Sequence, residues 1–255
     1  MRYLICIKQT PDTAELPKVK PEEAASGKLS VQMVVNPWDE NALEGGIQMM
    51  ENYGGEAGAI TVGGDDASER LRSALAMGCK DATLVKDETA DAWGVAKLLA
   101  AAIHKMGNVT YAITGQNTVD GNSGTVPVAL GRALGWPVLT GVAKVISASE
   151  TSITVERAVG QARHTVTAPA PAVLSVIKEI GEPRYPTFIN IRKAAKIEIP
   201  VWTAADLGAS VPAPVVHAGG FRKPPARDAK VVMLNGSPAE SAAALIDALL
   251  AEKVL

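Results

Sequence analysis

The chain has 255 residues, of which 47% are hydrophobic, so it can bury a sizeable core as one large domain or as one domain with a tail. Its formal net charge of −2 gives no general attraction to nucleic acid or to an anionic membrane surface, and neither partner is expected. We see no stretch near the ~20 apolar residues that a membrane-spanning helix needs, and the apolar part of the first residues is too short for a signal peptide.

Side chains that could perform covalent or metal chemistry are scarce and dispersed. Cys6 and Cys79 are the only cysteines, and their spacing is typical of a protein in a reducing, cytoplasmic compartment. The three histidines, His104, His164 and His217, have no partner at metal-ligand spacing, so we expect ordinary surface or packing roles for them. We therefore expect no catalytic residue and no metal, in a protein that binds something and does little covalent work itself.

The first elements in chain order are a strand and a helix. Residues 3–8 form a short apolar run that predicts a buried strand. After a polar loop, Asn36 has the character of a helix N-cap, with Pro37 as the first helical residue. Asp39 stands at the position that a capping box fills with Glu or Gln. Apolar residues then recur at helical spacing until Gly54 ends the helix.

Between residues 57 and 135, short apolar strands alternate with helices. Strands are expected at 57–64, 81–86 and 110–115, and helices at 65–78, at 89–107 and from the loop after residue 115 to about residue 135. This alternation predicts βαβ units with right-handed crossovers. The expected fold class is α/β, a parallel-sheet nucleotide-binding domain with helices on both faces.

The pattern changes after Trp136. Residues 151–160 and 162–168 alternate between apolar and polar side chains, which predicts a small antiparallel β ribbon. A buried strand is expected at 171–177. Residues 179–227 are rich in Pro, Gly, Ala and basic side chains and show little periodicity, so an extended C-terminal arm is expected there.

A helix is expected at the end of this arm, over residues 237–255. Ser237 is a plausible N-cap and Pro238 a first helical residue. The helix carries an apolar stripe that must be buried somewhere, formed by Ala242, Leu245, Leu249 and Leu250. We therefore expect two parts, a domain at 1–200 that includes a loop at 182–196, and an arm and helix at 201–255 that pack on a partner subunit.

The loop between the strand at 110–115 and the next helix contains Gly115, Gly121 and Gly124, with almost nothing that can do acid–base chemistry. Ligands of parallel sheets bind beyond the carboxyl ends of the strands, where this loop lies. The glycines are expected to adopt positive φ and to let the backbone approach a ligand closely.

Free N–H groups are expected in this loop at Asn122, Ser123, Gly124 and Thr125, beside the positive end of a helix dipole. Ser123 and Thr125 can add hydroxyl donors, so the arrangement suits a phosphate or pyrophosphate. The loop matches neither the Walker pattern nor GxGxxG. From these residues alone, a purely structural glycine-rich turn stays equally open.

Four stretches, in order over the first 200 residues, resemble one family. They are ICIKQTPDT (5–13), NPWDENALE (36–44), ALAMGCKDATLV (74–85) and GEPRYPTFINIRKAAK (181–196), and the last is long and distinctive. VWTAADLGA (201–209) is similar to a linker in many bacterial members. On these stretches the chain resembles the β subunit of electron transfer flavoproteins.

The resemblance implies an αβ heterodimer that accepts electrons from flavin-dependent dehydrogenases and passes them to another redox partner. In the family, the main FAD lies mostly on the α subunit. The β subunit holds a second nucleotide, which is AMP in simple members and FAD in bifurcating members. The chain would be an electron-carrier subunit rather than a stand-alone enzyme, in a simple carrier or in a flavin-based electron-bifurcating complex.

Carried over position by position, the resemblance implies a nucleotide cleft at the predicted strand-to-helix turns. Asp120, Gly121 and Val126 match the loop of FAD-binding members, whereas Gln116 and Asn117 depart from it. The loop matches AMP-type members less well, so FAD is preferred over AMP. The implied cleft residues are Cys6, Asn36, Pro37, Trp38, Asp39, Val62, Gly115, Gln116, Asn117, Thr118, Val119, Asp120, Gly121, Asn122, Ser123, Gly124, Thr125 and Val126.

Residues 182–196, here called the docking segment, resemble the family's recognition loop, which docks dehydrogenases. An exposed Phe188 among basic side chains would supply an apolar anchor with a charged rim. The alternative is a basic loop with Phe188 folded into the core. The implied docking residues are Glu182, Pro183, Arg184, Tyr185, Phe188, Arg192 and Lys193.

Two other classes of protein stay open. A stand-alone α/β domain that hydrolyses or senses an adenine nucleotide would need Lys or metal-binding carboxylates beside the phosphates. Asp120 is the only acid in the glycine-rich loop, and no Lys lies within it. The other class is a structural partner that binds a nucleotide without passing electrons through its own cofactor.

Overall fold

The protein is described from a computed structural model. The described residues are 1–27, 29–216, 219, 222–225 and 231–254, and His217 lies outside them. The chain divides into two compact units, residues 1–221 and residues 222–255. Each unit is described by itself.

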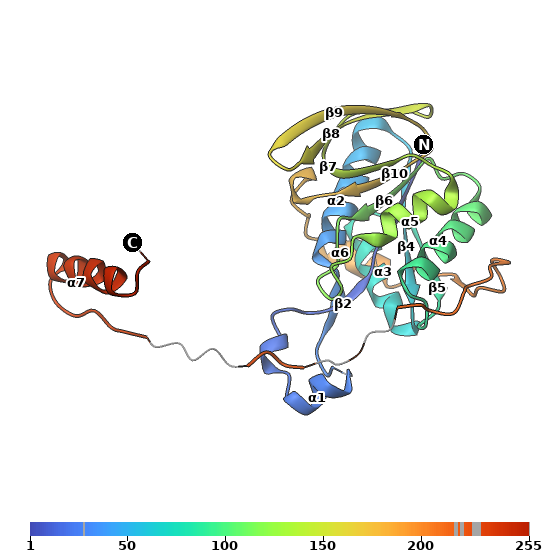
Figure 1. The fold of residues 1–255 in the computed structure, drawn as a ribbon. Coiled ribbons are helices and arrows are strands. Elements are labelled where there is room, and N and C mark those ends of the chain that lie inside the picture. The colour runs from blue at the N-terminus through green and yellow to red at the C-terminus, as the bar shows by residue number, and fades with distance from the viewer. Residues whose placement is uncertain (28, 217–218, 220–221, 226–230, 255) are drawn as a thin grey trace. The chain divides into compact units, whose positions relative to one another are not determined.

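A nine-stranded sheet forms the centre of the first unit, within its described residues (Figure 1). Its order is β11-β5-β4-β1-β6-β10-β7-β8-β9; the strands from β11 to β7 run parallel, and β8 and β9 are antiparallel. The expected parallel βαβ core is confirmed. The strands are β1 Arg2–Cys6, β4 Glu56–Gly63, β5 Asp81–Lys86, β6 Tyr111–Gly115, β7 Val138–Ala148, β8 Ser152–Val159, β9 Ala162–Pro169, β10 Ala172–Val176 and β11 Val201–Trp202.

The expected antiparallel ribbon is formed by β8 and β9, which extend the main sheet through the long strand β7. A separate two-stranded antiparallel sheet pairs β2 (Gln9–Pro11) with β3 (Met33–Val35). The helices are α1 Pro21–Ser26, α2 Pro37–Tyr53, α3 Ser68–Met77, α4 Ala92–Met106, α5 Thr125–Leu134, α6 Phe188–Ala194 and α7 Pro238–Ala251, with 3-10 turns η1 Leu16–Lys18, η2 Asp65–Ala67 and η3 Lys178–Ile180.

Helices cover both faces of the parallel sheet, as expected (Figure 1). Tyr3 and Ile5 of β1 belong to one hydrophobic cluster, together with residues of α2 and α3. Leu4 and Cys6 belong to the other, together with residues of α4 and α5. Since successive side chains of a strand point to opposite faces, β1 needs apolar residues at every position. That is why the sequence shows a continuous apolar run there.

Two adjacent glycines let α2 approach the sheet closely. A Cβ atom on Gly46 would lie 2.6 Å from a side-chain carbon of Ile5 and 3.3 Å from one of Ile113. A Cβ atom on Gly45 would lie 2.9 Å from the side chain of Ile180. Such distances leave no room for a side chain. Gly46 therefore fixes how α2 lies against β1 and β6, and Gly45 fixes how it lies against η3.

Part of the segment expected as an extended arm is folded, and that expectation is wrong for residues 188–194 and 201–202. Helix α6 begins at Phe188 after the N-cap residue Thr187, whose hydroxyl accepts a hydrogen bond from the N–H of Asn190 at 3.2 Å. Strand β11 pairs in parallel with β5 at the edge of the sheet. Both elements are too short for a periodic pattern, and tertiary contacts stabilise them instead.

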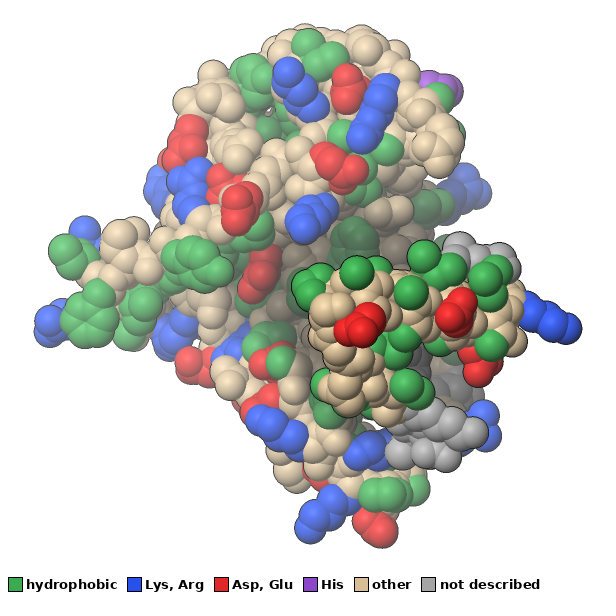
Figure 2. All heavy atoms as spheres, turned by 90° about the vertical axis from the view of Figure 1, so that its left-hand side faces the viewer, with side chains coloured by type: hydrophobic (Ala, Val, Ile, Leu, Met, Phe, Trp, Pro, Cys, Tyr) green, Lys and Arg blue, Asp and Glu red, His purple; other side chains and the backbone are tan. Residues whose placement is uncertain are grey.

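The second unit contains α7, which begins at Ser237 with Pro238 in its first turn, as expected. Glu240 completes a capping box, because its N–H donates to the Ser237 hydroxyl at 3.4 Å and its carboxylate accepts from the Ser237 N–H at 2.8 Å. No residue of α7 is buried within the described part of the chain. Figure 2 shows apolar side chains along this helix, with acidic side chains among them.

None of the described helices is long and apolar enough to cross a membrane. The described residues also contain no group of three His, Cys, Asp or Glu side chains placed to hold a metal ion.

Replacing Gly46 with Val should lower the free energy of unfolding by about 2 kcal/mol, because the new side chain would overpack the space of Ile5. Urea titration followed by circular dichroism measures this loss. The matched control is Asn52→Val at an exposed position of the same helix, which should cost much less. Equal losses in the two variants would contradict the close packing of α2 on β1.

Candidate functional site

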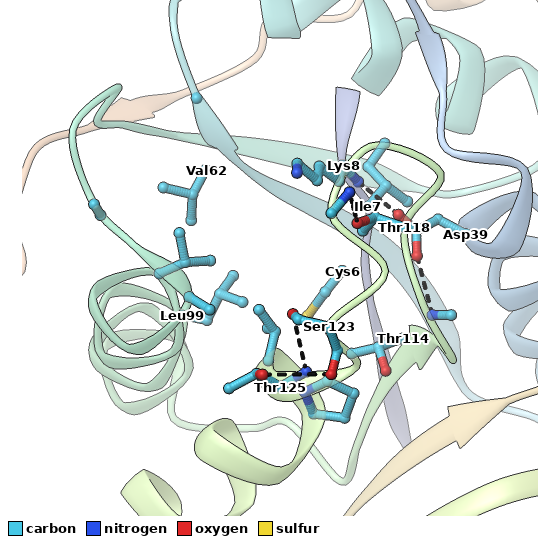
Figure 3. A pocket seen from close by; sticks show the side chains of 18 of the residues that line it. Cys6, Ile7, Lys8, Asp39, Val62, Leu99, Thr114, Thr118, Ser123 and Thr125 are labelled. Carbon is cyan, nitrogen blue, oxygen red and sulfur yellow. Dashed lines mark hydrogen bonds between the residues drawn. The ribbon is translucent and has the colours of Figure 1, made fainter. Parts of the chain in front are cut away.

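A cavity of about 370 Å³ opens at the carboxyl ends of the parallel strands (Figure 3). In the sheet, β4 and β5 lie on one side of β1, and the strand that comes next in the chain, β6, lies on the other side of β1. The strand order therefore reverses at β1, and the loops on either side diverge. Open α/β sheets bind their ligands at such a switch point.

The carboxylate of Asp39 bridges two of these strand ends from the first turn of α2. One oxygen accepts a hydrogen bond from the N–H of Lys8 at 2.8 Å, and the other accepts from the N–H of Gly115 at 3.0 Å (Figure 3). The expected capping role of Asp39 is therefore wrong. Its side chain satisfies backbone donors just after β1 and at the end of β6, where the strand ladders stop.

Asn36 occupies the N-cap position of α2, as expected, yet its side chain does not cap the helix. Its amide N–H donates to the carbonyl of Asn117 at 2.8 Å, and its amide oxygen accepts from the N–H of Val119 at 3.2 Å. Asn36 is fully buried. The start of α2 thus holds the glycine-rich loop by its backbone.

Asp120, the single acid of this loop, forms an ion pair with Lys8, with 2.7 Å between the carboxylate and the ammonium nitrogen. Burial raises the pKa of Asp120, but the hydrogen bonds from Lys8 and Thr118 outweigh it and hold the pKa below its usual range. Asp120 is therefore an anion whose charge is balanced by Lys8 next to the cavity.

Only one of the three loop glycines adopts the expected positive φ. Gly124 has φ +58° and Asn122 has φ +50°, whereas Gly115 and Gly121 have no positive φ, so the expectation is wrong for those two. Gly115 is needed for a different reason. A Cβ atom there would lie 2.6 Å from the carbonyl group of Trp38, so the loop could not approach α2.

The amide groups at the start of α5 are mostly free to meet a ligand. The expectation is wrong for Asn122, whose N–H donates to the carbonyl of Thr118 at 2.9 Å. The N–H of Thr125 makes a long contact of 3.4 Å to the hydroxyl of Ser123. Among the described residues, the N–H groups of Ser123, Gly124 and Val126 have no hydrogen-bond partner. These donors lie at the positive end of the α5 dipole and line the cavity.

The opposite wall of the cavity is apolar. Val62, Val95 and Leu99 line it from β4 and α4 (Figure 3). Cys6 also lines the cavity, and burial, reinforced by the charge of Asp39, raises the pKa of its thiol to about 12. A neutral thiol is neither a nucleophile nor a metal ligand. This wall can pack against an uncharged ring, while the start of α5 can bind an anion.

Twelve of the expected cleft residues line this cavity, and the remaining six do not: Asn36, Pro37, Trp38, Val119, Asp120 and Asn122. Of those six, Asn36 hydrogen-bonds to the backbone of the glycine-rich loop, and Asp120 forms an ion pair with the lining residue Lys8. Lining residues that the sequence reasoning missed are Ile7, Lys8, Gly63, Gly64, Asp87, Glu88, Ala90, Asp91, Ala92, Val95, Leu99, Thr114 and Pro127.

Four of the missed residues, Asp87, Glu88, Ala90 and Asp91, belong to the loop from β5 to α4. Asp91 caps α4 by accepting from the N–H groups of Trp93 at 3.1 Å and Gly94 at 3.0 Å. One carboxylate oxygen of Asp87 accepts from the N–H groups of Thr89 and Ala90 at 2.7 and 2.8 Å. These carboxylates are used by the backbone. The glycine-rich loop was singled out because ligands of parallel sheets bind beyond the carboxyl ends of the strands. The same rule applies to the loop from β5 to α4 and would have found it.

The docking segment exposes its aromatic residues. Phe188 is 73% exposed and Tyr185 is 95% exposed, so the alternative with Phe188 in the core is wrong. Ile189 and Ile191, which the sequence reasoning did not single out, are exposed beside Phe188. The guanidinium of Arg192 lies 5.9 Å from the centre of the Phe188 ring.

A parallel sheet with a cavity at its switch point defines an α/β protein of the kind that binds ligands beyond its strand ends. The family comparison agrees with this class and narrows it. Residues 28–207 match the family described as the electron transfer flavoprotein domain. The chain belongs to the electron transfer flavoprotein family.

Individual relatives cover nearly the whole chain. The caffeyl-CoA reductase-Etf complex subunit CarD of Acetobacterium woodii is 33% identical over 98% of each chain. The electron transfer flavoprotein subunit beta of Bacillus subtilis is 31% identical over 99% of this chain and 98% of that one. The subunit beta of Thermoanaerobacterium thermosaccharolyticum is 36% identical over 81% of this chain and 80% of that one. The similarity to β subunits is thus end to end.

The bridging carboxylate predicts an unusual pH dependence. Burial raises the pKa of Asp39 from 3.8 to about 7, although hydrogen bonds from the side chain of Asn36 and from the N–H groups of Lys8 and Gly115 oppose this. Between these two pH values the side chain is protonated in the folded state but ionised in the unfolded chain. The stabilisation from this group is therefore fully present below pH 3.8, falls as the pH rises, and is lost once the pH passes about 7.

Between pH 5 and pH 8 the wild type should lose about 3 kcal/mol of unfolding free energy through this group. Asp39→Asn is less stable at pH 5 but cannot titrate, so its profile should lack that slope. Urea titrations of both proteins at several pH values measure the difference. Parallel profiles across this window would show that Asp39 does not titrate there.

Proposed function

We propose that the chain is the β subunit of a heterodimeric electron transfer flavoprotein, which carries electrons between flavin-dependent dehydrogenases and another redox partner. End-to-end similarity to β subunits supports this assignment. The redox chemistry would belong to flavin, and the protein would supply binding, orientation and electrostatics. The scarcity of catalytic side chains in the cavity, where the thiol of Cys6 is neutral, agrees with such a role.

We infer that the cavity binds an adenine nucleotide. The observation that carries this inference is the row of unpartnered N–H groups of Ser123, Gly124 and Val126 at the start of α5, facing a cavity at the switch point. Such donors suit a phosphate. The apolar wall of Val62 and Leu99 suits the adenine ring.

The cavity size and the loop sequence bear on which adenine nucleotide we propose. A volume of about 370 Å³ lies at the small end of ligand pockets and suits an adenosine with its phosphate. Either AMP or the AMP half of FAD would fill it, and in FAD the flavin would then extend beyond the cavity. The loop residues Asp120, Gly121 and Val126 match FAD-binding members, so we propose FAD, with AMP as the alternative.

Two surfaces are proposed to meet partners. The exposed apolar side chains of α7, including Leu245 and Leu250, would pack on the α subunit. Phe188 in the docking segment would anchor a flavin-dependent dehydrogenase. The cysteine usage is consistent with a cytoplasmic complex.

The two other classes gain no support from the cavity. A hydrolase would need free carboxylates for a metal or a free Lys beside the phosphates. Asp39, Asp87 and Asp91 accept backbone hydrogen bonds, and Lys8 is paired with Asp120. Among the described lining residues this leaves only the exposed Glu88 as a carboxylate without a hydrogen bond or ion pair, and one carboxylate does not make a metal site. A purely structural partner would differ only in its redox behaviour, which the next experiment measures.

The test is to purify the chain together with its α subunit, record the visible spectrum, and identify the nucleotides released on denaturation by chromatography and mass spectrometry. Two flavins per heterodimer support FAD in the cavity, and one flavin with one AMP supports the simple carrier. Reduction of the flavins by a donor dehydrogenase, followed by stopped-flow spectroscopy, tests electron transfer. A heterodimer without flavin would remove the proposed function.

Gly124→Val should reduce the nucleotide content of the β cleft at least about tenfold. The new side chain would keep the phosphate away from the backbone, and at least one charge-assisted hydrogen bond to an N–H group would be lost. A Cβ atom there would also lie 2.8 Å from the side chain of Asn117. The matched control is Gly160→Val, at the same φ of +58° but with no atom within 4 Å of the new Cβ. If the first variant keeps full occupancy, the phosphate does not lie at α5.

Phe188→Ala should lower kcat/KM for reduction by a donor dehydrogenase by about tenfold or more, as expected for the loss of an interface anchor. Flavin content and the spectrum should stay unchanged. Ile146→Ala, at an exposed apolar position on β7, is the matched control and should keep the wild-type rate. An unaltered rate in the Phe188 variant would remove this residue from the docking role.

A further inference from the structure

Two arginines hold the two ends of the docking segment to the body of the first unit. At the start of the segment, the guanidinium of Arg184 lies between the carboxylates of Glu44 and Glu51 on α2. It donates to Glu44 at 2.8 and 3.0 Å and to Glu51 at 2.6 and 2.9 Å, and the backbone N–H of Arg184 donates to Glu44 at 3.1 Å. This is a forked arrangement that a single ammonium group cannot reproduce.

Glu44 is the buried partner of this cluster, with only 4% of its surface exposed. A buried carboxylate without a cation is costly, so Arg184 has little freedom to leave. Burial raises the pKa of Glu44, but the hydrogen bonds from Arg184 and Gln48 outweigh it and hold the pKa below its usual range. The same end of the segment is also held by the side-chain amide of Asn41, which donates to the carbonyl of Gly181 at 3.0 Å.

The far end of the segment is held by Arg72 of α3. One guanidinium nitrogen lies 3.0 Å from the carbonyl oxygen of Ala194, 3.2 Å from that of Ala195 and 3.3 Å from that of Ile197. These carbonyls belong to the C-terminal end of α6 and the turn after it, where a cation is favourable. Ala194 is buried beside this contact.

Between these two anchors the segment has an exposed apolar surface, formed by Tyr185, Phe188, Ile189 and Ile191. A seven-residue helix such as α6 is too short to be stable by itself. Exposed apolar side chains on a loose loop would lose conformational entropy when a partner binds, whereas a pre-ordered surface loses less. Anchoring both ends therefore lowers the conformational entropy that the segment would lose when a partner docks.

We propose that Arg184 and Arg72 are positioning residues that hold the docking segment in the shape a partner dehydrogenase recognises, and that Arg184 does not itself contact the partner. The proposal rests on the proposed docking function of the segment. The sequence resemblance implied that Arg184 contacts the partner, and a positioning role is proposed in its place. Four of the five N–H donors of the Arg184 guanidinium are already used within the subunit, whereas Arg192 and Lys193 are exposed and can meet acidic groups of a partner.

The first experiment measures the segment without any partner enzyme. Hydrogen–deuterium exchange of the purified heterodimer is compared for wild type, Arg184→Gln, Arg72→Gln and Arg184→Lys. Peptides covering 183–197 should exchange roughly tenfold faster in both Gln variants, the equivalent of one lost charge-assisted hydrogen bond. The glycine-rich loop at 115–126 should keep its exchange rate.

The matched control is Arg132→Gln, because Arg132 is an exposed arginine on α5 without an ion pair or hydrogen bond among the described residues. It should leave the exchange of 183–197 unchanged. Arg184→Lys should give only partial recovery, since Lys cannot fork to both carboxylates. Should Arg184→Gln destabilise the whole subunit, Glu51→Gln tests the same cluster at its exposed side. Wild-type exchange in that variant and in Arg72→Gln would overturn the proposal.

The second experiment separates positioning from contact by steady-state reduction with a donor dehydrogenase. A positioning residue should raise the KM for the heterodimer about tenfold in Arg184→Gln while kcat and flavin content hold. The dependence of kcat/KM on salt should run parallel to wild type, because no charge pair across the interface is lost. Arg192→Gln should change that salt dependence.

A changed salt slope in Arg184→Gln would show that Arg184 contacts the partner and would overturn its assignment as a positioning residue. If Phe188→Ala transfers electrons at the wild-type rate while exchange at 183–197 still rises in the Gln variants, the docking function fails and the two anchors stand as structural contacts. The two failures are therefore distinguishable.

Discussion

The carboxylate of Asp39 joins the end of β1 to the end of β6, and the geometry of the cavity depends on that bridge. At this edge of the sheet the strand ladders have ended, so the backbone donors of Lys8 and Gly115 need a new acceptor, and both are given one by the same side chain. Asn36, one turn earlier, holds the glycine-rich loop through its backbone at residues 117 and 119. The loop is thereby fixed while the N–H groups at the start of α5 stay unpartnered, which is the condition for an anion site.

Helix α2 connects this bridge to the other surface of interest. Its glycines allow it to lie close against β1, its first turn holds the strand ends, and its later carboxylates at Glu44 and Glu51 hold Arg184 at the start of the docking segment. One rigid element therefore positions both the proposed nucleotide cleft and the proposed docking surface. The sequence stretch NPWDENALE, at 36–44, contains residues for both tasks.

Sequence patterns within a single segment predicted the elements whose formation depends mainly on that segment. Apolar runs and glycine stops gave the alternation of strands and helices, and Ser237 correctly marked the start of α7. The roles of Asp39 and Arg184 could not be predicted in this way, because their partners lie far along the chain, at Lys8, Gly115 and Glu44. Likewise α6 and β11 are too short to produce a periodic signal and depend on tertiary contacts. The wall formed by the loop from β5 to α4 was missed only because the strand-end rule was applied to one loop.

In the function proposed here, these constraints build a cleft in which the start of α5 binds the phosphate of an adenine nucleotide. The most direct measurement is a crystal structure of the purified heterodimer with its native nucleotides. We expect a phosphate oxygen within about 3 Å of the N–H groups of Gly124 and Val126, with adenine against the apolar wall of Val62 and Leu99. A nucleotide bound elsewhere on the subunit, with the start of α5 in contact only with solvent, would contradict it.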